Sequence, residues 1–203
     1  MRKLTRPSPP KVLAERWREW SRAHEDGTQF YWHQHEGRPI NQHLLPLLRE
    51  MTSEHCSFCD GYPMGGMTTD TIEHFFPKAR YKTLAFFWPN LFLCCTACQA
   101  ASEKGWRVQF HAGRPLKPDR VRYEFTRFFV VDLTNGRIDP NPAASSKDQE
   151  RARLTCDVYD LNSDVRCRQR KRELRNFLNE RKQGTTPYLD DYPYRDFIAA
   201  GLE

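Results

Sequence analysis

The first quarter of the chain carries apolar side chains at helical spacing. Within residues 11–24 they fall on one face of an amphipathic helix. These positions are Val12, Leu13, Trp17 and Trp20. Residues 1–10 hold three prolines and three basic side chains, so we expect an extended arm before this helix. A second helix is predicted from Asn41, as its cap, to Met51, with leucines at helical spacing between them.

The pattern changes to that of strands in the second quarter of the chain. Residues 68–76 are rich in β-branched and aromatic side chains and predict a first strand, which Pro77 ends. After a connecting loop, residues 90–94 predict a second strand. Helix-forming residues follow from Thr96, and we expect the helix to close at Gly105. The predicted order is therefore strand, loop, strand, helix.

Strand signals return after residue 106 and give way to helices. Residues 121–125 alternate, and residues 128–133 lead into Asn135-Gly136, a dipeptide typical of a hairpin turn. Polar segments with helix-forming composition follow a Pro-rich loop. We predict helices over residues 147–158, 163–182 and 196–202.

Together these elements predict a mixed α+β fold built around one core. Residues 1–55 form an arm and helices that pack on the core, residues 56–115 form the core, and residues 116–203 form a C-terminal hairpin and basic helical extension. The length of 203 residues, with 38% hydrophobic side chains, is sufficient for a packed core.

The chain is basic, with a formal net charge of +6 and a sequence pI of about 9.0. This balance is compatible with a polyanionic partner and equally compatible with none. The predicted helix over residues 163–182 is rich in arginine, which indicates either a solvated face or a surface for phosphate or a partner. Candidates for that surface are Arg166, Arg170 and Arg172. Candidates for contact with nucleic acid are Lys78, Arg80, Lys104 and Arg107.

Two Cys-x-x-Cys pairs, Cys56/Cys59 and Cys95/Cys98, bracket the predicted strand–loop–strand segment. Four thiolates in two such pairs are typical of a tetrahedral Zn²⁺ site, with Zn–S distances of ~2.3 Å. The pairs of a compact zinc ribbon are roughly 15–20 residues apart, and here the separation is about twice that. We therefore expect a structural zinc ion to hold the base of a longer hairpin, with Gly61 allowing the turn after the first pair.

The other cysteines lack a partner at this spacing. Cys94 is interpreted as a buried strand residue, and Cys156 and Cys167 as core or free thiols. Residues 1–10 lack the apolar stretch of a secretion signal, and no run approaches the roughly 18 apolar residues of a membrane span. We expect a cytoplasmic protein without membrane contact, in which paired cysteines more often hold metal than form disulfides.

Glu73, His74 and Asn90 carry groups suited to hydrolysis of a phosphodiester. A neutral imidazole with a pKa near ~6.5 can deprotonate water at neutral pH, which suits His74. A carboxylate such as that of Glu73 suits a hard ion such as Mg²⁺ or Mn²⁺. Neighbouring side chains point to opposite faces of a regular strand, so we expect Glu73 and His74 at a strand end or bulge. The amide of Asn90 could orient His74 or its loop.

Each of these features also has a simpler interpretation. An isolated Glu-His pair is usually a surface accident, and a lone asparagine is more often a turn residue. Four cysteines alone mark a structural zinc finger more often than an enzyme. The nested order of Cys-x-x-Cys, Glu-His, Asn-Leu, Cys-x-x-Cys and Lys-Gly favours the enzyme.

With this nested order, residues 56–106 resemble zinc-containing members of the HNH (ββα-metal) endonuclease superfamily. Residues 72–78 (IEHFFPK) and 88–93 (WPNLFL) are similar to the HNH subunit of Septu-type antiphage defence, which also occurs in some retron loci. The resemblance covers most of the chain but is much weaker outside this core. It implies a zinc-stapled ββα-metal core with helical and hairpin extensions.

The resemblance also implies roles for individual residues. His74 would be the general base, Asn90 the structural asparagine, and Glu73 with the residue after Cys98 the ligands of a catalytic Mg²⁺ or Mn²⁺. That residue is Gln99, where the family usually has Asn or His. The implied partner is an ATPase of the ABC or SMC-like class.

Three hypotheses follow. The first is a metal-dependent endonuclease that hydrolyses phosphodiester bonds of DNA or RNA as the effector of antiphage defence, together with the ATPase. The second is a catalytically weakened, zinc-stabilised subunit that binds nucleic acid or a partner. The third is a structural subunit whose basic helix docks on an acidic face. Nothing in the sequence distinguishes a DNA substrate from an RNA substrate.

Overall fold

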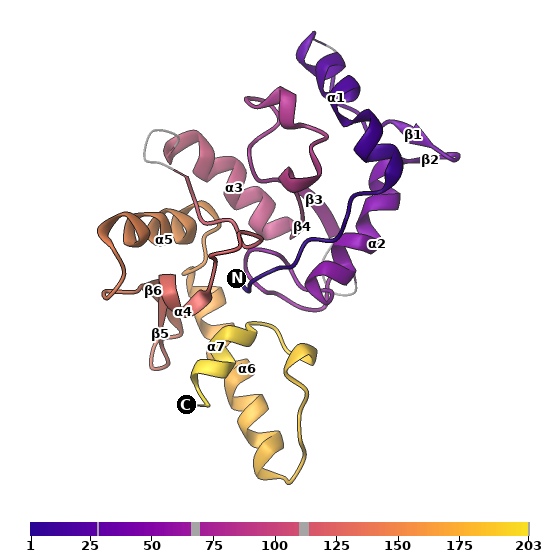
Figure 1. The fold of residues 1–203 in the computed structure, drawn as a ribbon. Helices are drawn as coiled ribbons and strands as arrows, with labels where there is room; N and C mark the ends of the chain where they lie inside the picture. Colours follow the sequence, from indigo (N-terminus) through magenta and orange to yellow (C-terminus); the bar gives the residue numbers. More distant parts are fainter. Residues whose placement is uncertain (28, 66–69, 110–113, 203) are drawn as a thin grey trace.

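In its described residues the protein has a mixed α+β fold of helices and three small two-stranded sheets (Figure 1). The structure is a computed structural model. It describes residues 1–27, 29–65, 70–109 and 114–202, with the side chains of residues 104 and 106–109 left out. No helix in these ranges combines the length and apolar character needed to cross a membrane.

The N-terminal part follows the predicted pattern with one correction. An extended arm leads into α1 (Lys11–Glu25), and a short hairpin of β1 (Gln34–His35) and β2 (Arg38–Pro39) precedes α2 (Ile40–Thr52). The prediction that Asn41 caps α2 is wrong, because the helix begins one residue earlier, directly after Pro39. The fixed φ of proline pre-organises the chain there, and no side chain caps the helix.

The strand–loop–strand–helix order is present in the central segment. β3 (Asp70–His74) pairs antiparallel with β4 (Leu91–Cys95), so that His74 faces Leu91 at one end and Asp70 faces Cys95 at the other. β3 is shorter than predicted, with residues 68 and 69 outside the described ranges. Between the strands the chain forms the 3-10 turns η1 (Lys82–Leu84) and η2 (Trp88–Asn90).

The helix α3 (Thr96–Gln109) continues through Gly105, which corrects the prediction that it closes there. A Cβ atom at Gly105 would lie 2.7 Å from the Cα atom of Val158. The glycine therefore allows α3 to approach the backbone of α5 (Ser146–Val158) closely, rather than ending the helix.

In the C-terminal part, the predicted strand over residues 121–125 is absent from the described structure. A turn occupies this segment and leads into α4 (Phe125–Phe128). The alternation was misleading because Phe125 and Phe128 are spaced by three residues and both are buried, as in a helical turn. β5 (Phe129–Asp132) and β6 (Arg137–Pro140) then form the predicted hairpin.

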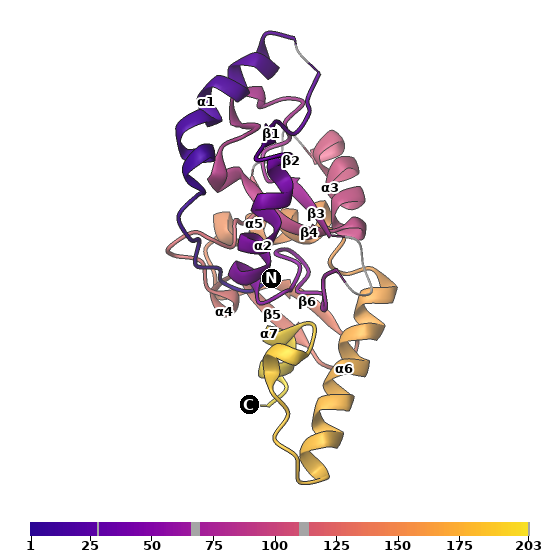
Figure 2. The same cartoon turned by 90° about the vertical axis from the view of Figure 1, so that its right-hand side faces the viewer.

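The remaining helices match the predicted segments within a few residues. α5 is capped by Ser145, whose side chain accepts a hydrogen bond from the backbone of Asp148. α6 (Asp164–Lys182) extends away from the body of the molecule in both Figure 1 and Figure 2. The chain then passes through η3 (Leu189–Asp191) and ends with α7 (Arg195–Ala200).

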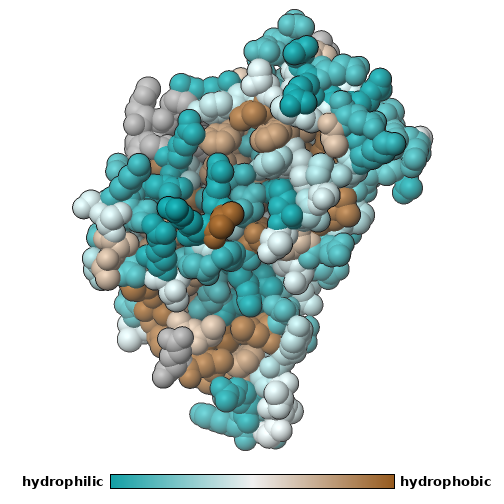
Figure 3. All heavy atoms as spheres, in the orientation of Figure 1, coloured by the Kyte–Doolittle hydropathy of each residue, from teal (hydrophilic) through white to brown (hydrophobic). Residues whose placement is uncertain are grey.

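One buried cluster contains side chains from all three predicted segments. The N-terminal arm is part of it, because Met1 and Leu4 are buried, and Arg6 forms an ion pair with Asp119 at 2.7 Å. Figure 3 shows hydrophilic side chains over much of one face and an apolar area over β5 and α7. Exposed apolar side chains here include Val130 in β5, Leu133 directly after β5 and Leu202 after α7.

Candidate active site and metal centre

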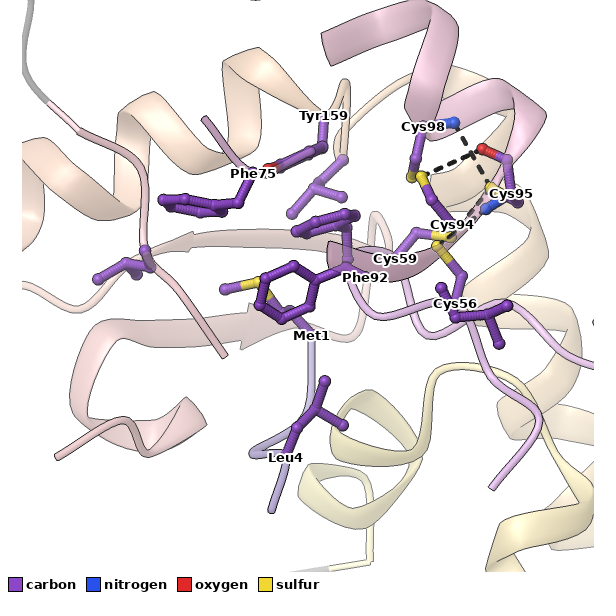
Figure 4. Packing of buried hydrophobic residues seen from close by; sticks show 14 of the residues in the cluster. Met1, Leu4, Cys56, Cys59, Phe75, Phe92, Cys94, Cys95, Cys98 and Tyr159 are labelled. Atoms are coloured by element: carbon purple, nitrogen blue, oxygen red, sulfur yellow. Dashed lines mark hydrogen bonds between the residues drawn. The ribbon is translucent and has the colours of Figure 1, made fainter. Parts of the chain in front are cut away.

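The four cysteines of the two Cys-x-x-Cys pairs meet in the structure. Their sulfur atoms lie within 4.8 Å of one another, and all four side chains are buried (Figure 4). The Sγ atoms of Cys59 and Cys95 are 3.8 Å apart. Bonds of ~2.3 Å to a common tetrahedral ion would place sulfurs at about this separation. This four-cysteine cluster can hold a structural metal such as zinc.

Local backbone geometry explains how each pair is formed. The first pair lies in a tight turn, in which the amide of Cys56 donates to the carbonyl of Gly61 at 2.9 Å. The left-handed residue of this turn is Asp60, with φ of 60°, so the prediction that Gly61 supplies the unusual conformation is wrong. In the second pair, Cys95 ends β4 and Cys98 lies in the first turn of α3.

Backbone amides also point at the sulfur atoms. The amide of Cys95 donates to Sγ of Cys56, and that of Cys98 donates to Sγ of Cys95, both at 3.4 Å. Donors aimed at a sulfur stabilise its thiolate form, which is the form that binds metal. The cluster is therefore supported by its own backbone.

The remaining cysteines are buried outside the cluster. The thiol of Cys94 donates to the carbonyl of Cys95 at 3.3 Å, and burial raises the pKa of Cys94 well above its ordinary value. Burial likewise raises the pKa of Cys156 to about 12. Cys167 is buried next to the carbonyl of Asn162. These residues occupy the core, as the spacing predicted.

Arg166 lies beside the four-cysteine cluster rather than on a surface. It is buried, and its Nη2 donates to Sγ of Cys98 at 3.1 Å. Burial lowers the pKa of Arg166, but the cysteine charges, that of Cys98 foremost, raise it by more. The prediction of an exposed role for Arg166 is wrong, because this guanidinium is the cation facing the thiolates.

Arg170 is also buried, which corrects the same prediction for this residue. Its guanidinium donates to the carbonyl of Gly136 at 2.9 Å and to that of Leu161 at 2.5 Å. Arg172 is exposed and forms an ion pair with Glu173 at 2.7 Å. Of the three predicted surface arginines, only Arg172 is placed to meet a partner.

Glu73 is buried at the end of β3 and faces α3. The hydroxyl of Ser102 donates to its Oε1 at 2.6 Å, and the side chain of Gln99 also hydrogen-bonds the carboxyl group. Burial raises the pKa of Glu73 to about 7, against the lowering effects of these two groups. The side chains of Glu73 and Gln99 therefore lie close to each other.

His74 is the last residue of β3, and only 4% of its surface is exposed. Its Nε2 lies 2.9 Å from the carbonyl of Ala85. Because a carbonyl only accepts, Nε2 carries the proton and Nδ1 keeps its lone pair. Burial, followed by the charge of Lys78, lowers the pKa of His74 to about 3, so the imidazole is neutral at pH 7.

The strand-end position predicted for the pair is observed, but the two side chains contact different parts of the protein. Glu73 meets α3, whereas His74 meets the loop at Ala85 and the rings of Phe30 and Trp32, with centroids at 5.4 and 5.9 Å. Lys78 is the charged neighbour that acts on both.

Asn90 fixes the loop between the strands. Its Oδ1 accepts from the amide of Phe76 at 2.7 Å, and its Nδ2 donates to the carbonyls of Phe76 and Leu84, both at 3.0 Å. Asn90 is 1% exposed, so these bonds replace water entirely. Of the two predicted possibilities, Asn90 holds the loop and not the imidazole.

The predicted nucleic-acid contacts are only partly described. Lys78 is half-buried, with Nζ 5.0 Å from the ring centroid of Phe30, and Arg80 is exposed. The side chains of Lys104 and Arg107 lie outside the described residues. Neither Glu73 nor His74 lines the large surface hollow beside α6. The hollow nearest the four-cysteine cluster has a volume of about 630 Å³ and lies between the first cysteine pair and α6.

Sequence reasoning missed two residues of the site. Ser102, which is 1% exposed, lies three positions after Gln99 and so on the same face of α3. This three-residue spacing could have identified Ser102 as a neighbour of Gln99 from the sequence. Arg166 left no such signal, since its contact with Cys98 joins residues far apart in the chain.

Comparison with known proteins gives no family for the chain. It matches no protein-family model, and no curated protein matches it significantly. Sulfur ligands suit a structural metal at the Cys95 end of the β3–β4 hairpin. The carboxylate of Glu73 and the imidazole of His74 lie towards the other end, and the amide of Gln99 follows Cys98 on α3.

Proposed function

We propose that this protein is a metal-dependent endonuclease of the HNH type that hydrolyses phosphodiester bonds of nucleic acid. One observation carries the proposal. On a strand–loop–strand–helix unit, Glu73 and His74 end the first strand, and Gln99 lies on the helix beside Glu73, directly after Cys98 of the four-cysteine cluster. This order of groups is the one that the sequence resemblance implies for a ββα-metal core.

The donor set next to α3 fits a catalytic Mg²⁺ or Mn²⁺. Glu73 offers a carboxylate and Gln99 an amide oxygen, which its side chain presents after rotation of its last bond. Such ions are held by one or two protein oxygens together with water and substrate phosphate. When bound, the ion would stabilise negative charge on the phosphate. Ser102 would keep the carboxylate of Glu73 in place.

The role of His74 follows from its tautomer. The hydrogen bond to Ala85 holds the ring and leaves Nδ1 as the basic nitrogen. Nδ1 would take a proton from the attacking water. The lowered pKa of about 3 makes this nitrogen a weak base in the free protein, so the proposal includes a rise of this pKa when an anionic phosphate binds beside the ring. Asn90 contributes by fixing the loop that carries Ala85.

A structural zinc ion in the four-cysteine cluster would hold the base of the hairpin.

The partner in this proposal is an ATPase of the ABC or SMC-like class, and the biological role is antiphage defence in the cytoplasm. These two points rest on the sequence resemblance. Co-expression with such an ATPase, followed by co-purification in comparison with Arg172→Glu, tests the partner directly.

The decisive test of catalysis is the purified His74→Ala variant. Plasmid DNA, single-stranded DNA and RNA are incubated with Mg²⁺ or Mn²⁺, and products are separated on gels. We expect cleavage by the wild type, none by His74→Ala, and unchanged cleavage by His35→Ala, a control histidine in β1. Equal zinc content and melting temperature of the variants exclude unfolding. Full activity of His74→Ala would refute the proposal.

A second function is favoured by the burial of the same groups. His74 is 4% and Glu73 9% exposed, so a substrate would need a rearrangement to reach them. A catalytically weakened subunit that binds nucleic acid or a partner would keep the zinc and the hairpin without cutting. It predicts affinity for nucleic acid that falls with salt, and no cut products with any divalent ion.

A further inference from the structure

Four consecutive ring-bearing residues precede β1 and pack beside His74. These residues are Phe30, Tyr31, Trp32 and His33. We call them the aromatic segment. The ring of Phe30 meets His74 edge-on, and that of Trp32 lies nearly parallel to it, with an angle of 19°. The aromatic segment therefore forms one wall around the candidate general base.

The inner rings of the aromatic segment are anchored by the core. His33 stacks on Trp20 with centroids 4.7 Å apart, and Phe30 stacks on Phe86 at 5.2 Å. Trp20 and Phe86 are buried and join the segment to α1 and to the β3–β4 loop. Segments anchored in this way lose little conformational freedom when a ligand binds.

Tyr31 differs from its neighbours because its side chain faces solvent. It is 54% exposed, and its inner edge rests against His33 with centroids 4.5 Å apart. An exposed ring supported from behind offers a flat face for another ring. Stacking of this kind is how proteins bind unpaired bases without reading their sequence.

The charge next to the aromatic segment fits the phosphate of such a nucleotide. Lys78 lies over the ring of Phe30, and its charge acts on both His74 and Glu73. The acidic residue nearest His33, Glu19, forms an ion pair with Arg16 at 3.4 Å, which offsets its charge. Lys78 therefore places a cation beside both the aromatic segment and the candidate active site.

We propose that Tyr31 and Lys78 bind a single-stranded substrate, Tyr31 by stacking on an unpaired base and Lys78 by attracting a phosphate. The inference deepens the proposed function, because it names single-stranded nucleic acid as the substrate class. In a duplex each base is covered on both faces by its neighbours, so a duplex cannot offer this face without unstacking. Single strands bind at no such cost.

The test is binding of a fluorescently labelled single-stranded oligonucleotide and of the duplex of the same sequence, by anisotropy without added divalent cation. We expect the wild type to bind the single strand more tightly. Tyr31→Ala should weaken that binding about 5- to 150-fold, given ~1–3 kcal/mol per stacked base. Tyr31→Trp should restore most of it. The control is Tyr188→Ala, which removes a tyrosine 66% exposed between α6 and η3 and should change nothing.

The contribution of Lys78 is measured in the same assay. Lys78→Gln should reduce the slope of log affinity against log salt by about 1, as expected for one lost phosphate contact, whereas Lys147→Gln, a control on α5, should leave the slope unchanged. Equal affinities of Tyr31→Ala and Tyr188→Ala would overturn the inference, as would equal wild-type binding of duplex and single strand.

The outcome is separable from that of the proposed function. Because no divalent cation is present, binding is measured without cleavage. A protein that binds through Tyr31 but never cuts would uphold this inference and refute the nuclease. A protein that cuts but is indifferent to Tyr31→Ala would do the opposite. The same binding assay with DNA and RNA oligonucleotides of one sequence shows whether the protein prefers deoxyribose or ribose.

Discussion

The two ends of the β3–β4 hairpin hold their functional groups in different ways. At the end near Cys95, four identical donors converge and complete a metal site within the chain. At the end near His74, single groups from a strand, a loop and α3 are held by bonds to each other and to backbone carbonyls. The first end can be completed by a single metal ion, whereas the groups at the second end are proposed to act on a substrate. Mutations should therefore unfold the protein at one end and mainly disable it at the other.

The largest effect is expected at the four-cysteine cluster. Cys98→Ser removes a ligand of an ion whose binding contributes about 10–16 kcal/mol in small zinc domains. We expect loss of the bound zinc, which metal analysis should find at about one per chain in the wild type, and loss of cooperative unfolding by circular dichroism. Cys94→Ala, a control at a buried neighbouring thiol outside the cluster, should keep the zinc. A Cys98→Ser protein that is folded and metal-free would show that folding does not require the metal.

The next effect is expected at the ion pair that joins the first cysteine turn to α7. Nη2 of Arg195 lies 2.6 Å from Oδ1 of Asp60, and both side chains are 4% exposed. Arg195→Ala leaves Asp60 buried without its cation, which costs about 3–5 kcal/mol. Urea unfolding measures the loss. Arg137→Ala breaks an exposed pair with Asp139 and should cost less than about 1 kcal/mol. Similar costs for both variants would show that Asp60 is reached by water.

At the other end of the hairpin, Asn90→Ala removes three hydrogen bonds to the loop. Because the freed backbone groups are left buried, we expect a cost of about 2–3 kcal/mol in urea unfolding with unchanged zinc content. Asn179→Ala, an exposed position on α6, should cost almost nothing. Loss of zinc in Asn90→Ala would mean that the two ends are not independent.

The smallest effect on stability is expected for Ser102→Ala, which removes the hydroxyl on Glu73. The cost should be about 1 kcal/mol, as for a single hydrogen bond. If the proposed function holds, half-maximal cleavage should also require more Mg²⁺, because Glu73 is less well held. Ser146→Ala at the exposed start of α5 is the control for stability. An unchanged metal requirement would separate Ser102 from the candidate active site.

Features set by local spacing could be predicted from the sequence. The pairing of β3 with β4, the hairpin at Asn135-Gly136 and the meeting of four cysteines all depend on short motifs. The proximity of Glu73 and Gln99 was implied only by the resemblance to the HNH superfamily. Boundaries were less well predicted, because Pro39 takes the cap position of α2 that was assigned to Asn41.

Features set by tertiary packing could not be predicted. A run of arginines on a helix predicts a solvent-exposed face. Arg166 and Arg170 are nevertheless buried, because sulfur atoms and carbonyls from other elements accept their hydrogen bonds. Gly105 read as a helix stop, yet it is a point of close helix contact with Val158. In each case the deciding partner is distant in the sequence, so no local pattern records it.

The tip of the β5–β6 hairpin has a consequence for the metal end. Gly136 has φ of 83°, and a Cβ atom there would lie 2.2 Å from the carbonyl oxygen of Cys167, on the first turns of α6. Any side chain at this position would push the hairpin and α6 apart. Arg166, the residue before Cys167, would move with the helix and away from Sγ of Cys98. A substitution at Gly136, which contacts none of the four cysteines, would thereby move the nearest positive charge away from their sulfur atoms.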